Sequence, residues 1–238
     1  MRGNRRLTFL GPGNPLSFPD PNESDDEGLL AVGGDLSPAR LLYAYEKGIF
    51  PWYSAGVPPL WWSPNPRALM TRERLHISRS LRRTLRSGRF EVTFDRAFAD
   101  VIDACASNRD GGTWILPEMR QAYVQLHQLG HAHSFEVWRD GQLAGGLYGV
   151  RRGALFAAES MFHVVTDASK VALAVTIDTL FGAGTRVFDV QFVTEHLASL
   201  GAYEVSRSQY LAQVLLATPR PIEPRAIERA LDGWATRF

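Results

Sequence analysis

Two carboxylates lie in segments that otherwise look like apolar strands. Glu159 ends the run FAAE, and Asp189 lies inside VFDVQF. Carboxylates are rarely buried without a partner or a function. Because residues i and i+2 of a strand share a face, Asp189 and Gln191 are expected to point together, away from Phe188 and Val190. Such a pair could orient a nucleophile and accept its proton in acyl transfer, or it could only anchor the sheet.

Other chemistries are poorly supported by the sequence. His131 and His133 form an HxH pair, but no cysteine or suitably spaced third histidine completes a metal site, so a hydrogen-bonding role is expected. Cys105 falls on the apolar stripe of an expected helix and is predicted to be inert core. The glycine clusters GGLYG and FGAG are not followed by the helix start that a phosphate cradle needs. We therefore expect no metal and no cofactor.

Arginine dominates the basic residues, and its distribution is uneven. The chain has 26 basic and 25 acidic side chains, so its overall charge indicates no partner. Residues 72–89, however, hold seven arginines against one acid. Arg79, Arg82, Arg83 and Arg86 recur at i, i+3, i+4 and i+7, which places them on one helix face. Because arginine binds phosphates in a bidentate manner, this face is either a polyanion-binding patch or an ordinary solvated surface.

Residues 133–192 are expected to position the two acids. The order of elements is strand, strand, strand, helix, strand, with a hairpin turn at Asp140-Gly141. An antiparallel meander followed by a crossover helix is typical of α+β acyltransferase cores. The expected elements are strands at His133–Trp138, Leu143–Val150, Ala154–Glu159 and Val187–Phe192, and a helix from Asp167 or Ser169 through Phe181.

The flanking segments predict further helices and one irregular region. Residues 1–28 are rich in Gly, Pro and acids and are expected to be irregular. The segment 48–67 is dense in proline and aromatic residues, which excludes a helix and indicates a rigid aromatic-lined loop or edge. A domain boundary is expected near residue 63. One helix is expected to begin at Ser37-Pro38 and to end at Gly48, and a second to be capped by Asp95 and to run through Cys105. Three more are expected at Pro117 to Gly130, Ser206–Leu216 and Pro224–Trp234.

Length and composition limit the class of protein. A chain of 238 residues suggests one or two domains. No stretch approaches the ~20 apolar residues that cross a bilayer. The basic N-terminal segment is interrupted by Gly11, Pro12, Gly13 and Pro15, so it does not resemble a secretory signal. A single cysteine agrees with a reducing compartment, and we expect a cytoplasmic protein.

Several long motifs, in order along the chain, closely resemble the leucyl/phenylalanyl-tRNA–protein transferase family. The resemblance runs from Leu29 to Ala202 and leaves out only the two ends. It rests on GIFPWY, LWWSPNPRA, LHISRSLRR, GTWI, YVQLHQLGHAHSFEVW, LAGGLYGV, LFAAESMF, ASK, DVQ and HLASLGA.

The resemblance implies a fold and an activity. The fold would be α+β, with a small N-terminal domain at 1–62 and, at 63–238, a catalytic domain resembling the acetyl-CoA-dependent N-acetyltransferase (GNAT-like) fold. The enzyme would take Leu or Phe, and less well Met, from aminoacyl-tRNA and join it to proteins with N-terminal Arg or Lys. This would mark them for degradation by the bacterial N-end rule. We expect a monomer without membrane partners.

The resemblance also implies roles for individual residues. Asp189 and Gln191 match a proton-relay pair, although a path through the tRNA ribose hydroxyl is an alternative. Glu159 matches an acid at the acceptor site. Trp52 and Trp114 match the aromatics that hold the terminal adenosine, with Tyr45 and Tyr123 as neighbours. The amino-acid pocket would be lined by Leu147, Phe156, Met161 and Phe188, for which the residue pattern alone allows a core role equally well.

Two rival functions remain from other classes. An acyl-CoA N-acetyltransferase would need a glycine-containing pyrophosphate loop before the crossover helix, whereas this chain has SMFHVVTDASK there. A non-catalytic RNA-binding protein would use the arginines and tryptophans but would leave Glu159, Asp189 and Gln191 unexplained.

Overall fold

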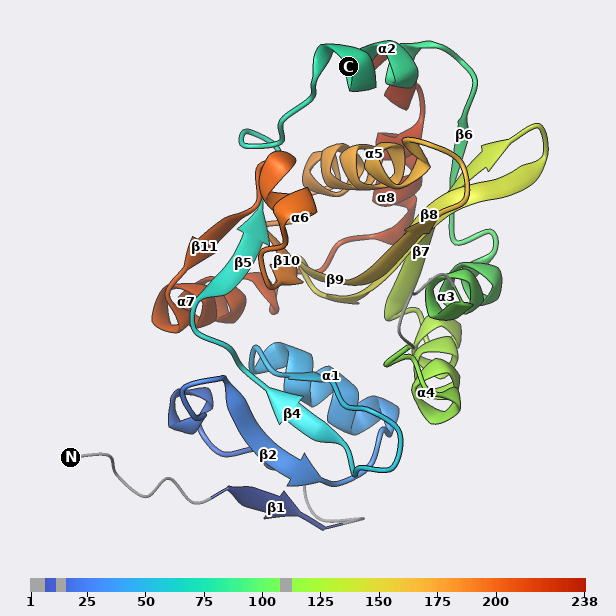
Figure 1. Cartoon of the computed structure of the whole chain (residues 1–238). Helices are drawn as coiled ribbons and strands as arrows, with labels where there is room; N and C mark the ends of the chain where they lie inside the picture. Colours follow the sequence, from blue (N-terminus) through green and yellow to red (C-terminus); the bar gives the residue numbers. More distant parts are fainter. Residues whose placement is uncertain (1–6, 12–15, 108–112) are drawn as a thin grey trace.

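The computed structural model describes residues 7–11, 16–107 and 113–238 and has two sheets (Figure 1). The predicted α+β class is confirmed. The smaller sheet belongs to the N-terminal unit, here residues 7–62, and has the strand order β1-β2-β4-β3. One helix, α1, lies between this sheet and the rest of the molecule (Figure 1). Its elements are β1 (Thr8–Leu10), a short 3-10 turn η1 (Pro21–Glu23), β2 (Leu29–Gly33), α1 (Pro38–Glu46), β3 (Phe50–Pro51) and β4 (Leu60–Trp62).

The larger sheet has seven strands in the order β11-β5-β10-β9-β8-β7-β6. Only β9 and β10 pair in parallel, because α5 crosses over between them, and the other neighbours are antiparallel. The strands are β5 (Arg67–Met70), β6 (Glu91–Phe94), β7 (Ala132–Arg139), β8 (Gln142–Arg152), β9 (Leu155–His163), β10 (Val187–Gln191) and β11 (Tyr203–Val205).

Helices cover both faces of the larger sheet. Adjacent residues of β8 point to opposite faces: a side chain at Gly145 would meet Ala168 of α5, and one at Gly146 would meet Val101 of α3. The helices are α2 (Arg79–Arg86), α3 (Phe98–Ser107), α4 (Pro117–Gln128), α5 (Ala168–Gly182), α6 (Glu195–Ser199), α7 (Arg207–Ala217) and α8 (Pro224–Leu231), followed by a 3-10 turn η2 (Trp234–Arg237).

The hydrophobic core on the α3 and α4 side continues into the N-terminal unit. Buried Leu41 and Trp61 of that unit belong to the same cluster as Val101, Tyr148 and Val150 of the larger one. A second cluster lies around α5 and includes Leu155, Phe156 and Phe188. The N-terminal unit is therefore packed onto the larger sheet through shared core.

Most predicted elements are present, with four differences. The helix expected to reach Trp234 ends at Leu231. Strand β9 runs to His163, four residues beyond its expected end. Residues 1–28 contain β1 and η1, although 1–6 and 12–15 lie outside the described residues. The prediction that Asp95 caps α3 is wrong: its carboxylate accepts a bond from Ser134 N, while Glu136 accepts from the backbone N–H groups of Arg96 and Ala97 before the helix.

Strands β9 and β10 separate near the two predicted acids, Glu159 and Asp189. Their parallel pairing stops at Asp189 and Ala157. Beyond that point each strand carries one extra residue, Glu159 in β9 and Val190 in β10. Such bulges bend a strand and redirect its side chains. The two strands therefore diverge and leave space between them.

Candidate active site

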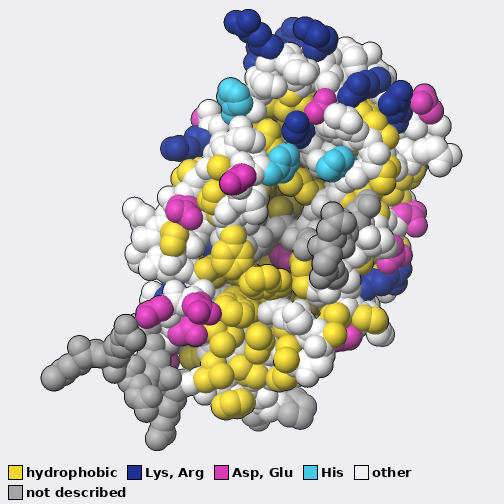
Figure 2. Space-filling view, in the orientation of Figure 1, with side chains coloured by type: hydrophobic (Ala, Val, Ile, Leu, Met, Phe, Trp, Pro, Cys, Tyr) yellow, Lys and Arg dark blue, Asp and Glu magenta, His cyan; other side chains and the backbone are white. Residues whose placement is uncertain are grey.

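A pocket of about 420 Å³ opens where β9 and β10 diverge. Figure 2 shows this hollow bordered by hydrophobic side chains. Both units contribute to it, the N-terminal unit through Phe50, Pro51 and Trp52. The remaining lining comes from Trp114, Leu147, Ala158, Glu159, Ser160, Met161, Leu173, Val190, Gln191, Phe192, Thr194 and Leu197. The pocket thus offers mostly apolar surface with very few polar groups, of which Glu159 is the carboxylate.

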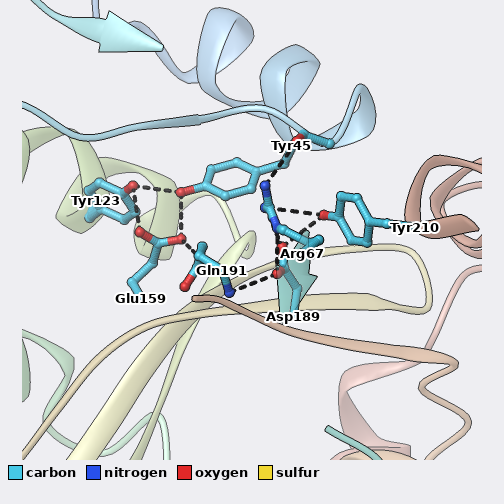
Figure 3. A network of polar contacts seen from close by, with 8 residues as sticks. Tyr45, Arg67, Tyr123, Glu159, Asp189, Gln191 and Tyr210 are labelled. Atoms are coloured by element: carbon cyan, nitrogen blue, oxygen red, sulfur yellow. Dashed lines mark hydrogen bonds and ion pairs between the residues drawn. The ribbon is translucent and has the colours of Figure 1, made fainter. Parts of the chain in front are cut away.

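Two buried phenols contact the Glu159 carboxyl group (Figure 3). Tyr45 Oη donates to Glu159 Oε1 at 2.8 Å, and Tyr123 Oη contacts Oε2 at 3.1 Å. The two tyrosine hydroxyls are 2.6 Å apart. Burial raises the pKa of Glu159 to about 7, although both tyrosine hydrogen bonds oppose this rise. Glu159 can therefore gain and lose a proton near neutral pH.

Asp189 belongs to a different, fully buried network (Figure 3). Its carboxylate accepts from Arg67 Nε at 2.8 Å, from Arg67 Nη2 at 2.5 Å and from Tyr210 Oη at 2.7 Å. The guanidinium of Arg67 contacts the faces of the Phe50 and Tyr210 rings, 4.7 and 4.5 Å from their centroids. Asp189 is not among the residues that line the pocket. Its oxygens are already engaged by neighbouring donors.

Gln191 connects the two networks. Its backbone N–H donates to Asp189 Oδ1 at 2.9 Å, and its side-chain Nε2 lies 3.5 Å from Glu159 Oε1. The residue has a φ of 57°, in the left-handed region that few non-glycine residues adopt. The bulge at Val190 interrupts the alternation of β10, so the expectation that Asp189 and Gln191 share one face does not hold. Gln191 faces the pocket, while Asp189 supports it from behind.

The other predicted site residues divide into two groups. Trp52, Trp114, Leu147 and Met161 line the pocket. The remaining four do not, and each is almost fully buried elsewhere. Phe156 and Phe188 stack on each other in the core with centroids 5.4 Å apart, because paired positions of β9 and β10 share a face. Tyr45 and Tyr123 contact the Glu159 carboxyl group and do not line the pocket.

The predicted arginine face is present on α2. Ser78 caps the helix, and Leu81, Thr84 and Leu85 form its buried side. Arg79, Arg82, Arg83 and Arg86 are all exposed on the opposite side. Arg82 and Arg86 also line a second pocket of about 350 Å³ with Arg72 and Arg237. The basic side chains at the top of Figure 2 mark this end of the molecule.

Sequence reasoning missed Arg67, Tyr210 and Phe192. Arg67 stands directly before the apolar run ALM and is fully buried, so a charged residue at the start of a buried strand was the available signal. Phe192 lies 5.8 Å from Trp52, ring to ring, and helps to form the aromatic rim. Tyr210 lies on α7 and reaches Asp189 across 21 residues. No local pattern marks that contact.

The residues considered for metal or thiol chemistry have structural surroundings. His133 Nδ1 lies 2.6 Å from Asp95 Oδ2, and Arg151 Nε donates to Nε2, which confirms a hydrogen-bonding role. Cys105 is buried, as predicted. Within residues 7–11, 16–107 and 113–238, no group of three or more His, Cys, Asp and Glu side chains is arranged to hold a metal ion. No helix of this described part has the length and apolar character to cross a membrane.

Solved structures with some likeness to the chain have low sequence identity. A GCN5-related N-acetyltransferase from Kribbella flavida has 10% identity and a TM-score of 0.38, over 71% of this chain and 61% of that one. L-PGS from Bacillus licheniformis has 11% identity and a TM-score of 0.39, over 85% and 74% of the two chains.

Sequence comparison gives far stronger matches. The chain is 56% identical over 209 residues to a leucyl/phenylalanyl-tRNA–protein transferase of Anaeromyxobacter sp., which covers 87% of this chain and 89% of the relative. It is 51% identical over 216 residues to that of Nitratidesulfovibrio vulgaris, with 90% and 92% covered. Family models for the N-terminal domain and for the transferase match residues 34–65 and 69–215. The chain therefore belongs to the leucyl/phenylalanyl-tRNA protein transferase family.

Proposed function

We propose that this protein transfers leucine or phenylalanine, and less well methionine, from aminoacyl-tRNA to proteins that begin with Arg or Lys. The family supports the general activity, a tRNA-dependent transfer of an amino acid to a protein. The observation that carries the proposal is the apolar pocket with Glu159 and Gln191 at its polar end. Transfer to Arg or Lys would mark the acceptor for N-end-rule degradation, in the cytoplasm and by a monomeric enzyme.

The amino acid of the donor would occupy the apolar part of the pocket. Leu147, Met161, Leu173 and Val190 offer no hydrogen-bonding side chain there, so the pocket would read only shape and apolarity. Leucine, phenylalanine and methionine are unbranched at Cβ, whereas valine and isoleucine are branched. A pocket that is narrow at its entrance would reject the branched side chains.

The adenosine that carries the amino acid would stack on the aromatic rim. Trp52 is 43% exposed, and Trp114 also lines the pocket. The ring of Trp52 is supported by Trp62 and Phe192, each with a centroid distance of 5.8 Å. A supported, half-exposed indole is a suitable platform for any base, because every base has a π-face.

The acceptor would bring its ammonium group to Glu159. The aminoacyl ester is already activated, so the site has to orient the amine, remove a proton and stabilise the tetrahedral oxyanion. Glu159 would pair with the cationic N-terminal residue, and the Gln191 amide would orient the reacting groups. Asp189 would act through its bond to the Gln191 backbone and is proposed as a positioning residue.

The body of the tRNA would bind to α2. Arg79, Arg82, Arg83 and Arg86 are exposed on one helix face and are suited to backbone phosphates. Contacts of this kind supply affinity without reading sequence, and the amino acid pocket would supply the selectivity.

Transfer of labelled leucine tests the proposal directly. Charged tRNA is incubated with a peptide that begins with Arg, and product is measured against a peptide that begins with Ala and an N-acetylated Arg peptide. We expect product only with the free Arg peptide. Acetyl transfer from acetyl-CoA in place of leucyl transfer, or equal use of all three peptides, would contradict it.

A further inference from the structure

Three contacts join the Glu159 carboxyl group and two phenol hydroxyls in a closed ring (Figure 3). Tyr45 Oη lies 2.8 Å from Oε1, Tyr123 Oη lies 3.1 Å from Oε2, and the two hydroxyls lie 2.6 Å apart. The phenols come from α1 and α4 and are 2% and 0% exposed. They therefore contact each other and the carboxylate away from bulk water. We call these three side chains the carboxyl–phenol ring.

Counting protons shows that this ring is complete in only one protonation state. Each hydrogen bond needs one proton, and each phenol supplies one. With Glu159 ionised, two protons serve three contacts, so one oxygen pair lacks a donor. With Glu159 protonated, a third proton is available and every contact is satisfied in one direction around the ring. The hydroxyl pair at 2.6 Å has the length of a formed O–H···O bond.

We propose that the carboxyl–phenol ring is the proton acceptor of the reaction, with Tyr45 and Tyr123 as positioning residues that close around Glu159 when it takes a proton. This inference rests on the proposed aminoacyl transfer. The acceptor amine arrives as ammonium and gives one proton to the Glu159 carboxylate. The amine nitrogen then bonds to the ester carbonyl carbon and the C–O bond breaks. Its second proton goes to the ribose oxygen, and Glu159 returns the first proton to water.

The charges around the ring suit a group that titrates near neutral pH. Burial is the largest influence and raises the pKa of Glu159, and the charge of Asp189 on β10 raises it further. Arg67 on β5 and the hydrogen bonds from Tyr45 and Tyr123 lower it. Gln191 faces the same carboxylate with its neutral amide, and Tyr210 on α7 is also close enough to interact. The opposing influences leave a pKa of about 7.

Removing one phenol hydroxyl should move the titration of Glu159 in a defined direction. Hydrogen bonds to a charged acceptor are about twice as strong as neutral ones. The hydrogen bonds from Tyr45 and Tyr123 both lower the pKa of Glu159, so Tyr45→Phe and Tyr123→Phe should each raise it. We expect the acid limb of the kcat/KM pH profile to move upward by about one pH unit in each variant. At a pH below the limb this is a roughly tenfold loss of activity, with recovery at high pH.

Controls separate this effect from packing. The control is Tyr43→Phe. Tyr43 lies on α1 with Tyr45 but contacts Phe18 and Lys47, outside the carboxyl–phenol ring, so the pH profile of this variant should match that of the original chain. Glu159→Gln should lose the acid limb altogether. Thermal melting shows whether the tyrosine variants fold normally. The proposal would be overturned if folded tyrosine variants keep the acid limb at its original pH while Glu159→Gln has no acid limb.

An infrared titration gives a readout without turnover. The carboxylic acid band that is absent in Glu159→Gln identifies the protonated state, and we expect it to titrate near neutral pH in the original chain. Ionisation at the ordinary value of 4.5 would overturn the ring even if the tyrosine variants fail to fold. If no aminoacyl transfer occurs at any pH, the proposed function fails, and the infrared result still decides whether the ring holds a proton.

Discussion

Arg67 and Asp189 form a two-pronged ion pair in which neither side chain is more than 1% exposed. Arg67 also donates to the carbonyl of Gly48 at 3.3 Å, so the pair joins β5 and β10 to the N-terminal unit. A buried ion pair is costly to break from one side, because the remaining charge stays in the core without a partner. The pair therefore fixes both the backbone of Gln191 and the position of Phe50.

Asp189→Asn should lower stability and slow the reaction. The variant leaves the Arg67 guanidinium without its counter-charge, at a cost of ~3–5 kcal/mol. The double variant Arg67→Met/Asp189→Leu removes both charges and should regain most of the melting temperature. It should still react slowly in single turnover, because the Gln191 N–H has lost its acceptor.

Melting and single-turnover rate have to be measured on the same preparation. Asp178→Asn is the matched control, since Asp178 is also buried, pairs with Arg72 and Arg237 and does not line the Glu159 pocket. Because Asp178 lines the second pocket with Arg82 and Arg86, the rates are compared at saturating tRNA. It should lose stability and keep its rate. A double variant with a normal rate would show that Asp189 only anchors the sheet.

Glu159→Gln should change how stability depends on pH. The folded pKa of about 7 lies above the ordinary value of 4.5, so the folded state binds this proton more tightly than the unfolded state. The free energy of unfolding therefore falls as pH rises through this interval, by ~3 kcal/mol, and Glu159→Gln should lack this decline. Urea unfolding at several pH values measures the difference. Parallel curves for the two proteins would contradict a raised pKa.

Trp52→Ala and Trp114→Ala should each weaken use of the donor. Stacking contributes ~1–3 kcal/mol per base, which is roughly 5- to 150-fold in kcat/KM. Trp138→Phe is the control, because Trp138 lies on β7 outside the pocket. The assay uses both charged tRNA and a minimal aminoacyl-adenosine. A loss seen with tRNA but not with the minimal donor would exclude these residues as the stacking platform.

Replacing Arg79, Arg82, Arg83 and Arg86 together by Ala should raise KM for charged tRNA and flatten its salt dependence. Each lost phosphate contact reduces the slope of log K against log salt by ~0.7–0.9. The fold should be retained, since the buried side of α2 is Leu81, Thr84 and Leu85. The control is Arg225→Ala/Arg229→Ala, which removes two positive charges from another helix, α8. An unchanged salt slope would show that the arginine face of α2 is an ordinary solvated surface.

Substitutions at Met161 and Phe188 should have opposite kinds of effect. Met161 lines the pocket, so Met161→Ala should improve use of valyl- and isoleucyl-tRNA relative to leucyl-tRNA. Phe188 packs against Phe156 in the core, so Phe188→Ile should lower the melting temperature by the loss of ring contacts and leave donor preference unchanged. Donor competition assays measure both. A changed Leu-to-Phe ratio in Phe188→Ile would place this residue in the pocket after all.

The sequence predicted those site features that depend on short-range pattern. Glu159 and Asp189 stand out because carboxylates interrupt apolar strands, and the α2 arginines follow from helical spacing alone. The directions in which the ends of β9 and β10 run could not be predicted. An extra residue such as Val190 has no recognisable sequence pattern, and it moves the side chains that follow to the other face of the strand. Tyr45 on the apolar side of α1 gives no sign that its hydroxyl meets Glu159, 114 positions away.

The core shared by the two units has a consequence for synthesis. Leu41, Tyr45 and Trp61 share one buried cluster with residues of α3, α4 and the larger sheet, so part of the core around the N-terminal unit is supplied by residues that leave the ribosome later. Domains usually fold as units, with the N-terminal one first. Here the shared cluster is complete only after Tyr123, Tyr148 and Phe162 have emerged. During that interval its apolar face is open to chaperones and to aggregation.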